Sequence, residues 1–402
     1  MKLKFKYLLT SVTAAILMTA VTACSGSDEP APVPAPEPAG KNEPVDRAVL
    51  LYLLADNSLG RGGFDRQNLA DMIQACRDGA FGGNRLIIYH DDSKAEKPML
   101  KEVTPLGLKI LKEYDAAPLS VAPGRMEEVI GDFKRIAPAD RYGLILWSHA
   151  TGWLINGENS ANTSGTAPLW FGEDRRNYMN IPVLAGVLEG KGFDYIYFDC
   201  CHMASLESLY ELRDAADIFA GSCAELPSEG MPYRTALPYL MKKDADLTGA
   251  AKATFGKYDV LTGRDRTCTM SVIDARQLDR LAGATRDFYA THPTLPEDYT
   301  GQPFERPRLN GEPCYLFDYQ DYIDALYFEN RTSPEVRQAY AAILDVMDDC
   351  VVYQASTPSV FNTIDIDAHC GLTTFILRDP SDADIQGYRT LAWYRDVASA
   401  LF

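Results

Sequence analysis

The chain has 402 residues, of which 39 are Lys or Arg and 56 are Asp or Glu, and its formal net charge at pH 7 is −17. So acidic a chain argues against a nucleic acid partner and against electrostatic adhesion to anionic lipid. The nine cysteines include no CxxC pair and show no metal-ligand spacing, so neither a disulfide-dense small fold nor a cysteine metal site is expected.

The N-terminal 45 residues are predicted to lie outside the folded part. Residues 1–23 carry early lysines and then a short apolar stretch, which is typical of a secretory signal peptide. The stretch ends at Val21-Thr22-Ala23-Cys24, which resembles the lipobox of bacterial lipoproteins and implies a lipid on Cys24. An ordinary signal peptide with an incidental cysteine is the alternative. Residues 24–45 are rich in Pro and Ala and predict an extended tether, so the folded domain is expected to span 46–402.

The first part of the domain, about 46–240, alternates short apolar runs with amphipathic helical patterns of ten to fifteen residues. This alternation predicts βαβ units and a doubly wound α/β/α sandwich around a mostly parallel sheet. The runs that read as strands are 48–54, 85–90, 143–147, 195–198 and 217–221. A Gly- and Asn-rich loop is expected at 152–178.

The remainder, about 241–402, is less regular and is expected to form a C-terminal α/β extension. Helical patterns lie near 233–258, 276–290 and 333–350. Strands are predicted at 268–273, 362–367 and 372–377. We expect these strands to lengthen the same sheet and the helices to pack over it.

Two of the predicted strands end in reactive side chains. The run 143–147 is followed by Ser148 and His149, and the run 195–198 is followed by Asp199-Cys200-Cys201-His202. Because carboxyl ends of parallel strands open into one crevice, a thiolate and an imidazole are expected to meet there. Imidazole can take the thiol proton and return it to a leaving amine, as a cysteine peptidase requires. The 52-residue separation of His149 and Cys201 also resembles the caspase spacing of roughly 50.

These segments resemble the clostripain-like cysteine peptidases of the caspase-related clan. Residues 148–153, Ser-His-Ala-Thr-Gly-Trp, match the family's His-Gly-Ser/Thr-Gly-Trp motif. Residues 198–204, Phe-Asp-Cys-Cys-His-Met-Ala, match Phe-Asp-Ala-Cys-Leu/Phe-Met-Gly/Ala. Further similarity lies at 53–57, 171–174, 225–233 and 391–394, so the resemblance spans essentially the whole mature chain. It implies a caspase-like fold and a peptide or protein substrate.

The resemblance implies a role for each residue of the two motifs. Cys201 corresponds to the nucleophile and His149 to the general base and acid. The backbone N–H groups of Cys201 and Ala150 would form the oxyanion hole, although the family usually has glycine at the position of Ala150. Cys200 replaces an alanine and is expected to point to the opposite face of the strand. His202 is a rival base, but we expect its side chain to point away from Cys201.

Acidic residues near the strand ends bear on specificity. The family prefers to cleave after Arg or Lys, which requires a carboxylate in the pocket. Asp199 is the best match, and Glu229 and Asp56 are further candidates. Alternatives are a capping carboxylate for Asp199, a solvated loop residue for Glu229 and a helix cap for Asp56. Arg175-Arg176 lies in the expected loop and suggests self-cleavage there.

The sequence therefore predicts a cysteine endopeptidase of the cell envelope, lipid-anchored to the outer membrane. A monomer without a cofactor is expected, although the family resemblance leaves a calcium requirement open. Two alternatives remain. One is an inactive binding or scaffold lipoprotein of the same fold, which the departures at Ala150 and His202 favour. The other is a thiol amidase that acts on cell-wall peptides.

Overall fold

The computed structural model describes residues 43–153, 170–305 and 314–402. The expected signal peptide, the lipidation site Cys24 and nearly all of the tether lie outside these ranges. Within them, no helix has both the length and the apolar character needed to cross a membrane.

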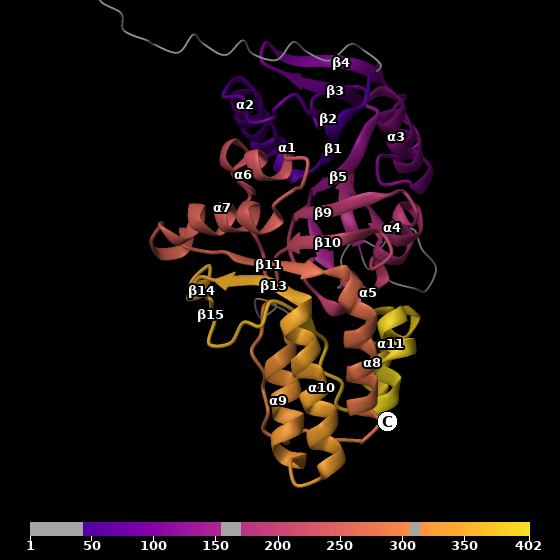
Figure 1. Ribbon diagram of the computed structural model, residues 1–402, viewed down its shortest axis with the longest axis vertical. Helices are drawn as coiled ribbons and strands as arrows, with labels where there is room; N and C mark the ends of the chain where they lie inside the picture. Colours follow the sequence, from indigo (N-terminus) through magenta and orange to yellow (C-terminus); the bar gives the residue numbers. More distant parts are fainter. Residues whose placement is uncertain (1–42, 154–169, 306–313) are drawn as a thin grey trace, which may run out of the picture. The chain divides into compact units, whose positions relative to one another are not determined.

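A nine-stranded sheet with the order β13-β11-β10-β9-β5-β1-β2-β3-β4 forms the centre of the fold (Figure 1). The five central strands are mutually parallel, as the βαβ pattern predicts. They are β10 (Ala216–Gly221), β9 (Phe193–Asp199), β5 (Ala139–Trp147), β1 (Val45–Ala55) and β2 (Arg85–Asp92). Antiparallel strands extend both edges: β3 (Met99–Thr104) and β4 (Gly107–Glu113) on one side, β11 (Thr269–Asp274) and β13 (Val351–Ser356) on the other.

Helices cover both faces of the sheet, because the central strands are apolar on both sides. In β1, Leu50, Tyr52 and Leu54 enter one core, and we call their side the α3 face. The alternate residues Val49, Leu51 and Leu53 enter a second core on the α2 face. The helices that bury side chains on the α3 face are α3 (Pro123–Ile136), α4 (Ile181–Leu188), α5 (Leu206–Glu211), α8 (Leu278–Tyr289), α9 (Tyr319–Asn330), α10 (Pro334–Cys350) and α11 (Ala392–Asp396). Those on the α2 face are α2 (Phe64–Arg77), α6 (Tyr233–Leu240) and α7 (Leu247–Asp259).

A small three-stranded sheet lies beyond the end of β5 and corrects the prediction of one loop over 152–178. It consists of β6 (Ala150–Gly152), β7 (Trp170–Asp174) and β8 (Asn177–Asn180). Trp170 and Phe171 are buried in β7, and burial of these aromatic rings stabilises a hairpin that Gly and Asn content alone does not reveal. The predicted loop is therefore a β7–β8 hairpin over its last third.

The C-terminal extension also differs from the prediction at two of its strands. Residues 362–367 and 372–377 contribute only the two-residue strands β15 (Ile364–Asp365) and β16 (Thr373–Thr374). These pair with β14 (Ser359–Val360) and β12 (Phe317–Asp318), outside the main sheet. The main sheet instead gains β13, which follows α10 directly. Residues 372–377 read as a strand because most of their side chains are buried in the core of the α3 face.

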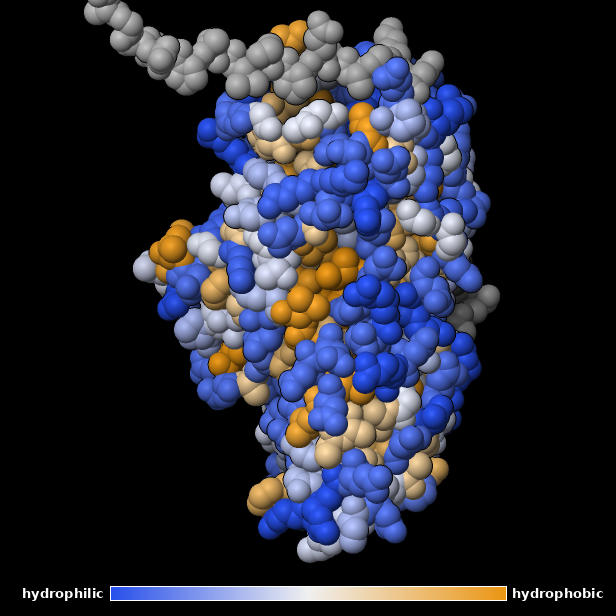
Figure 2. Space-filling model, in the orientation of Figure 1, coloured by the Kyte–Doolittle hydropathy of each residue, from blue (hydrophilic) through white to orange (hydrophobic). Residues whose placement is uncertain are grey.

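The surface agrees with the acidic, polar composition. The face drawn in Figure 2 is mostly hydrophilic, with apolar residues in a few separate areas. The most exposed large apolar side chains, Leu106 and Val260, are 96% and 79% accessible and lie far apart in the sequence. The short helices α1 (Ser58–Gly62), η1 (Gly263–Asp265), η2 (Ala275–Gln277), η3 (Pro380–Thr390) and η4 (Ala398–Leu401) complete the fold.

Candidate active site

The register of β5 and β9 brings the two reactive strand ends together. These strands are adjacent and parallel, and Trp147 lies opposite Asp199. His149 and Cys201 each follow this pair by two residues, so both motifs start from neighbouring strand ends. Adjacent strands are about 4.8 Å apart, so the two motifs leave the same edge of the sheet side by side. The 52-residue separation in the sequence therefore equals the register offset between the strands.

A close backbone contact joins the two motifs directly. Gly152 has φ of +62°, and a Cβ at this position would lie 2.6 Å from the carbonyl oxygen of His202. Only glycine combines that conformation with so close an approach. The end of the histidine motif thus packs against the turn that carries Cys201.

Cys201 is half-buried in this turn. The backbone N–H of Leu226 donates to its Sγ at 3.4 Å, and the carbonyl oxygen of Leu226 is 4.0 Å from the sulfur. An N–H directed at sulfur stabilises negative charge on it, as a nucleophilic thiolate requires.

Cys200 occupies the opposite side of the strand, as predicted. It is buried in the core of the α3 face, whereas the neighbouring odd-numbered residues Tyr195 and Tyr197 enter the core of the α2 face. Burial raises the pKa of the Cys200 thiol well above its usual value, so this thiol stays protonated and inert.

His149 is half-buried, and its ring is held by a serine. The Nε2 atom is 2.7 Å from Oγ of Ser58. Burial lowers the pKa of His149 and the nearby Arg61 lowers it further, while Glu225 acts in the opposite direction. The imidazole is therefore neutral at pH 7, the form that accepts a proton.

His202 is engaged elsewhere. It is 7% exposed, has φ of 59°, and its Nδ1 is 3.2 Å from the carbonyl oxygen of Cys223. Its backbone N–H donates to Ala224. The residue lies in a left-handed turn, and α5 begins only at Leu206, after the Ser205 cap. The ring contact with Cys223 argues against its use as the base.

Alanine at position 150 introduces no backbone strain. Ala150 lies in β6 opposite Phe171, and its φ is outside the left-handed region that favours glycine. The departure from the family's glycine therefore leaves the backbone N–H in place without a conformational cost.

Asp199 lies on the face of Cys201 and is 5% exposed. Its Oδ1 accepts the backbone N–H of Met231 at 2.8 Å, and its Oδ2 accepts the hydroxyl of Tyr233 at 2.7 Å. Burial raises the pKa of Asp199 to about 6, although both hydrogen bonds and Lys257 favour the charged form. The carboxyl group is thus mostly ionised at neutral pH, and it titrates just below.

The structure brings Glu229 to Asp199 but gives Asp56 other partners. Glu229 is exposed. The next residue, Gly230, packs so closely against the Asp199 carboxylate that a Cβ has no room there. Asp56 pairs with Nε of Arg175 at 3.3 Å. Its pKa is raised by burial and by Asp174.

Sequence patterns missed several residues of this region. Ser58 carries no motif of its own, although it follows Asp56 and Asn57 at the end of β1. The role of Tyr233 depends on a hydrogen bond across 34 residues, which no local pattern encodes. In the sequence Trp153 is only the last residue of the histidine motif, yet its ring lies 5.1 Å from the rings of both Phe375 and Tyr388.

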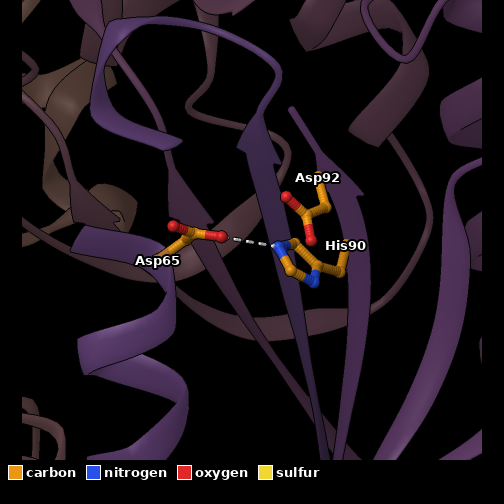
Figure 3. A group of neighbouring side chains, drawn as sticks. All are labelled: Asp65, His90 and Asp92. Carbon is orange, nitrogen blue, oxygen red and sulfur yellow. Dashed lines mark hydrogen bonds and ion pairs between the residues drawn. The ribbon is translucent and has the colours of Figure 1, made fainter. Parts of the chain in front are cut away.

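One other cluster has the side chains of a metal site. Ligand atoms of Asp65, His90 and Asp92 all lie within 4.8 Å of one another (Figure 3). However, Nζ of Lys101 is 2.9 Å from Nδ1 of His90, so Nε2 carries the proton that is donated to Asp65. Nη1 of Arg66 lies 3.5 Å from Asp65 and 3.6 Å from Asp92. Protein cations already neutralise these carboxylates, and the donor set does not favour a metal ion.

Solved structures with the same architecture are cysteine proteases. An inactive zymogen of a C11 protease from Parabacteroides distasonis matches with a TM-score of 0.72 and 28% identity, over 88% of this chain and 99% of that chain. A secreted C11 cysteine protease from Bacteroides thetaiotaomicron, in complex with an irreversible peptide inhibitor, matches with a TM-score of 0.71 and 27% identity, over 89% and 99%. The predicted caspase-like α/β sandwich is therefore confirmed, and the fold and site define a cysteine peptidase.

The sequence itself identifies the family. The model of the clostripain family, peptidase family C11, matches residues 51–399. The chain thus belongs to the clostripain family of cysteine peptidases. A search of curated proteins gives no significant match.

Proposed function

We propose that this peptidase cleaves peptide bonds after Arg or Lys, with Cys201 as nucleophile and His149 as general base and acid. The observation that carries the proposal is the β5–β9 register, in which Trp147 lies opposite Asp199 and the two motif residues each follow two positions later. The neutral state of His149 at pH 7 supports its role as proton acceptor.

The proposed reaction passes through an acyl-enzyme. His149 takes the thiol proton of Cys201, and the thiolate attacks the carbonyl carbon of the scissile bond. The backbone N–H groups of Cys201 and Ala150 stabilise the oxyanion, where one donor is typically worth about 2.7 to 4 kcal/mol. The imidazolium then gives its proton to the leaving amine. A water molecule deprotonated by His149 hydrolyses the thioester and regenerates the thiol.

Asp199 supplies the proposed specificity for a basic side chain. Its carboxylate lies on the face of Cys201, and Met231 and Tyr233 hold it in place by hydrogen bonds. A guanidinium or ammonium group would pair with this charge in a site of low polarity, where the interaction is strong. Glu229 adds a second, exposed negative charge. Asp56, which pairs with Arg175, contributes only to the negative potential of the same sheet edge.

A peptidyl electrophile ending in Arg tests the proposal. It should form an adduct with the purified protein and with the Cys200→Ala variant, but not with Cys201→Ala. Parallel cleavage of Arg-, Lys- and Asp-terminated reporters should show activity on the first two alone. An adduct on Cys201→Ala would refute the assignment of Cys201 as the nucleophile. Preferred cleavage of cell-wall peptides would establish the thiol amidase instead. An inactive scaffold predicts no adduct on any variant.

The proposal extends to cofactor and location. The proposed chemistry uses only side chains and backbone N–H groups of this chain together with water, so we propose that the enzyme needs no cofactor. We also propose that it is a monomer. Activity that is lost on chelation and restored by calcium would refute the absence of a cofactor. We also propose export and a lipid on Cys24 that anchors the enzyme in the outer membrane. Release of a Cys24→Ser variant from the membrane fraction is expected, and unchanged retention would exclude this anchor.

A further inference from the structure

We propose that Ser58 is a positioning residue for His149, which it holds in the tautomer that leaves Nδ1 free to take the thiol proton. The inference rests on the proposed role of His149 as the base. Its geometric basis is the distance of 2.7 Å between Oγ of Ser58 and Nε2 of His149.

The backbone around Ser58 is fixed by its neighbours. Asn57 caps α1 by accepting the N–H of Leu59, and its amide group donates to the carbonyl oxygens of Leu54 and Glu173. A Cβ on Gly60 would lie only 1.8 Å from the carbonyl oxygen of Ala55, so the first turn of α1 packs directly on the end of β1. Ser58 is exposed, yet its main chain is held in place on both sides. Its hydroxyl can therefore orient the ring with little loss of conformational entropy.

The hydrogen bond has a chemical consequence for the histidine. A neutral imidazole carries one proton, and the serine hydroxyl can donate to Nε2 or accept from it. The proposed arrangement is the one in which Nε2–H donates to Oγ, which leaves the lone pair on Nδ1. After Nδ1 takes the thiol proton, the Nε2–H bond to Ser58 persists, so the ring keeps its orientation through the cycle. A hydroxyl is a neutral acceptor and does not raise the basicity of the ring as a carboxylate does. The charged groups that act on His149 are Arg61 and Glu225, with opposite effects on its pKa.

Steady-state kinetics on an Arg reporter test the role of Ser58. Ser58→Ala should lower kcat by about 3- to 10-fold with KM unchanged, which is the typical worth of one hydrogen bond. Ser58→Thr should recover most of this loss because it keeps the hydroxyl. Ser399→Ala, at an exposed serine of η4, is the matched control and should behave as wild type. Ser58→Asp should move the acidic limb of the kcat/KM pH profile to higher pH, because a carboxylate raises the pKa of the bonded imidazole.

The outcomes separate this inference from the proposed function. If wild type cleaves the reporter but Ser58→Ala has the same kcat and Ser58→Asp the same pH profile, the positioning role is refuted and the peptidase stands. If wild type cleaves no reporter, the proposed function fails, and ¹⁵N NMR of labelled histidines in the folded protein decides the contact. The Nε2–H tautomer at His149, lost in Ser58→Ala, supports the contact. The same tautomer mixture in both proteins refutes it.

Discussion

At the scale of single residues, alternation along one strand decides which thiol can react. Cys200 and Cys201 are neighbours in sequence, but Cys200 is buried in the core of the α3 face, while Cys201 is half-buried beside Leu226. Burial raises the pKa of the Cys200 thiol, and the Leu226 N–H contacts the sulfur of Cys201. Two adjacent cysteines therefore have opposite chemical properties.

The activity of Asp199→Asn tests the specificity residue. Asparagine keeps an acceptor for Met231 but has no charge, so kcat/KM for an Arg reporter should fall at least about 30-fold, mainly through KM. In wild type, KM for this reporter should rise as the pH falls below about 6, where Asp199 becomes protonated. Equal Arg-reporter kinetics for variant and wild type at pH 7.5 would show that another group reads the basic side chain.

The stability of the same variant checks the pKa of Asp199 independently. Because folding raises this pKa to about 6 from 3.8, the fold favours the protonated form. The contribution of protonated Asp199 to the free energy of unfolding is thus fully present below about pH 4 and is lost as the pH rises through about 6. The unfolding free energy of Asp199→Asn relative to wild type should therefore be about 1 kcal/mol higher at pH 8 than at pH 5 in urea titrations. A difference independent of pH would contradict the raised pKa.

At the scale of elements, the β7–β8 hairpin determines the backbone conformation of the dibasic pair. Arg175 and Arg176 form its tip with φ values of 49° and 65°. Arg175 also pairs with Asp174 at 2.9 Å and with Asp56 at 3.3 Å. A peptide that is recognised along a sheet edge is usually extended, whereas Arg175 and Arg176 adopt a tight left-handed turn. The hairpin therefore disfavours self-cleavage, although the same pair in an open loop would suit it.

We expect the purified enzyme to remain one chain between His149 and Cys201. Residues 154–169 contain no Lys or Arg. The other basic residue in this interval is Lys191, just after α4, whose backbone carbonyl oxygen accepts a hydrogen bond from Nζ of Lys134. Prolonged incubation should leave wild type and an Arg175→Ala, Arg176→Ala double variant as equal single bands on a denaturing gel. A new N-terminus at residue 176 or 177 by Edman sequencing would overturn this prediction.

At the scale of the whole molecule, the C-terminal extension is part of the catalytic unit. It supplies β11 and β13 to the main sheet, and its Phe375 and Tyr388 pack on Trp153 of the histidine motif. Glu207, six residues after Cys201, accepts hydrogen bonds from Thr374 and Phe375. Both motifs are thus tied to residues beyond 300.

The fragment 46–240 is therefore expected not to fold by itself. Without β11, the edge of β10 and the surfaces around Trp153 and Glu207 would be exposed. Circular dichroism and urea denaturation should show no cooperative transition for this fragment, whereas a chain of residues 43–402 should unfold in one transition. A soluble 46–240 fragment with cooperative unfolding would contradict the shared core.

The sequence by itself determined the features that depend on local pattern and motif. Apolar runs predicted the parallel strands, alternation separated Cys200 from Cys201, and two motifs identified the peptidase family. Each of these follows from residues close together in the chain, whose backbone geometry is the same in any context.

Tertiary structure alone decided the features that depend on distant partners. The contact of Ser58 with His149 spans 91 residues, and the Tyr233 bond to Asp199 spans 34. Residues 372–377 look like a sheet strand, yet they pack in a core, because apolar composition records burial but not the partner that provides it. The sequence also does not show that Ala150, at a position where the family usually has glycine, pairs with Phe171 in a backbone conformation open to any residue.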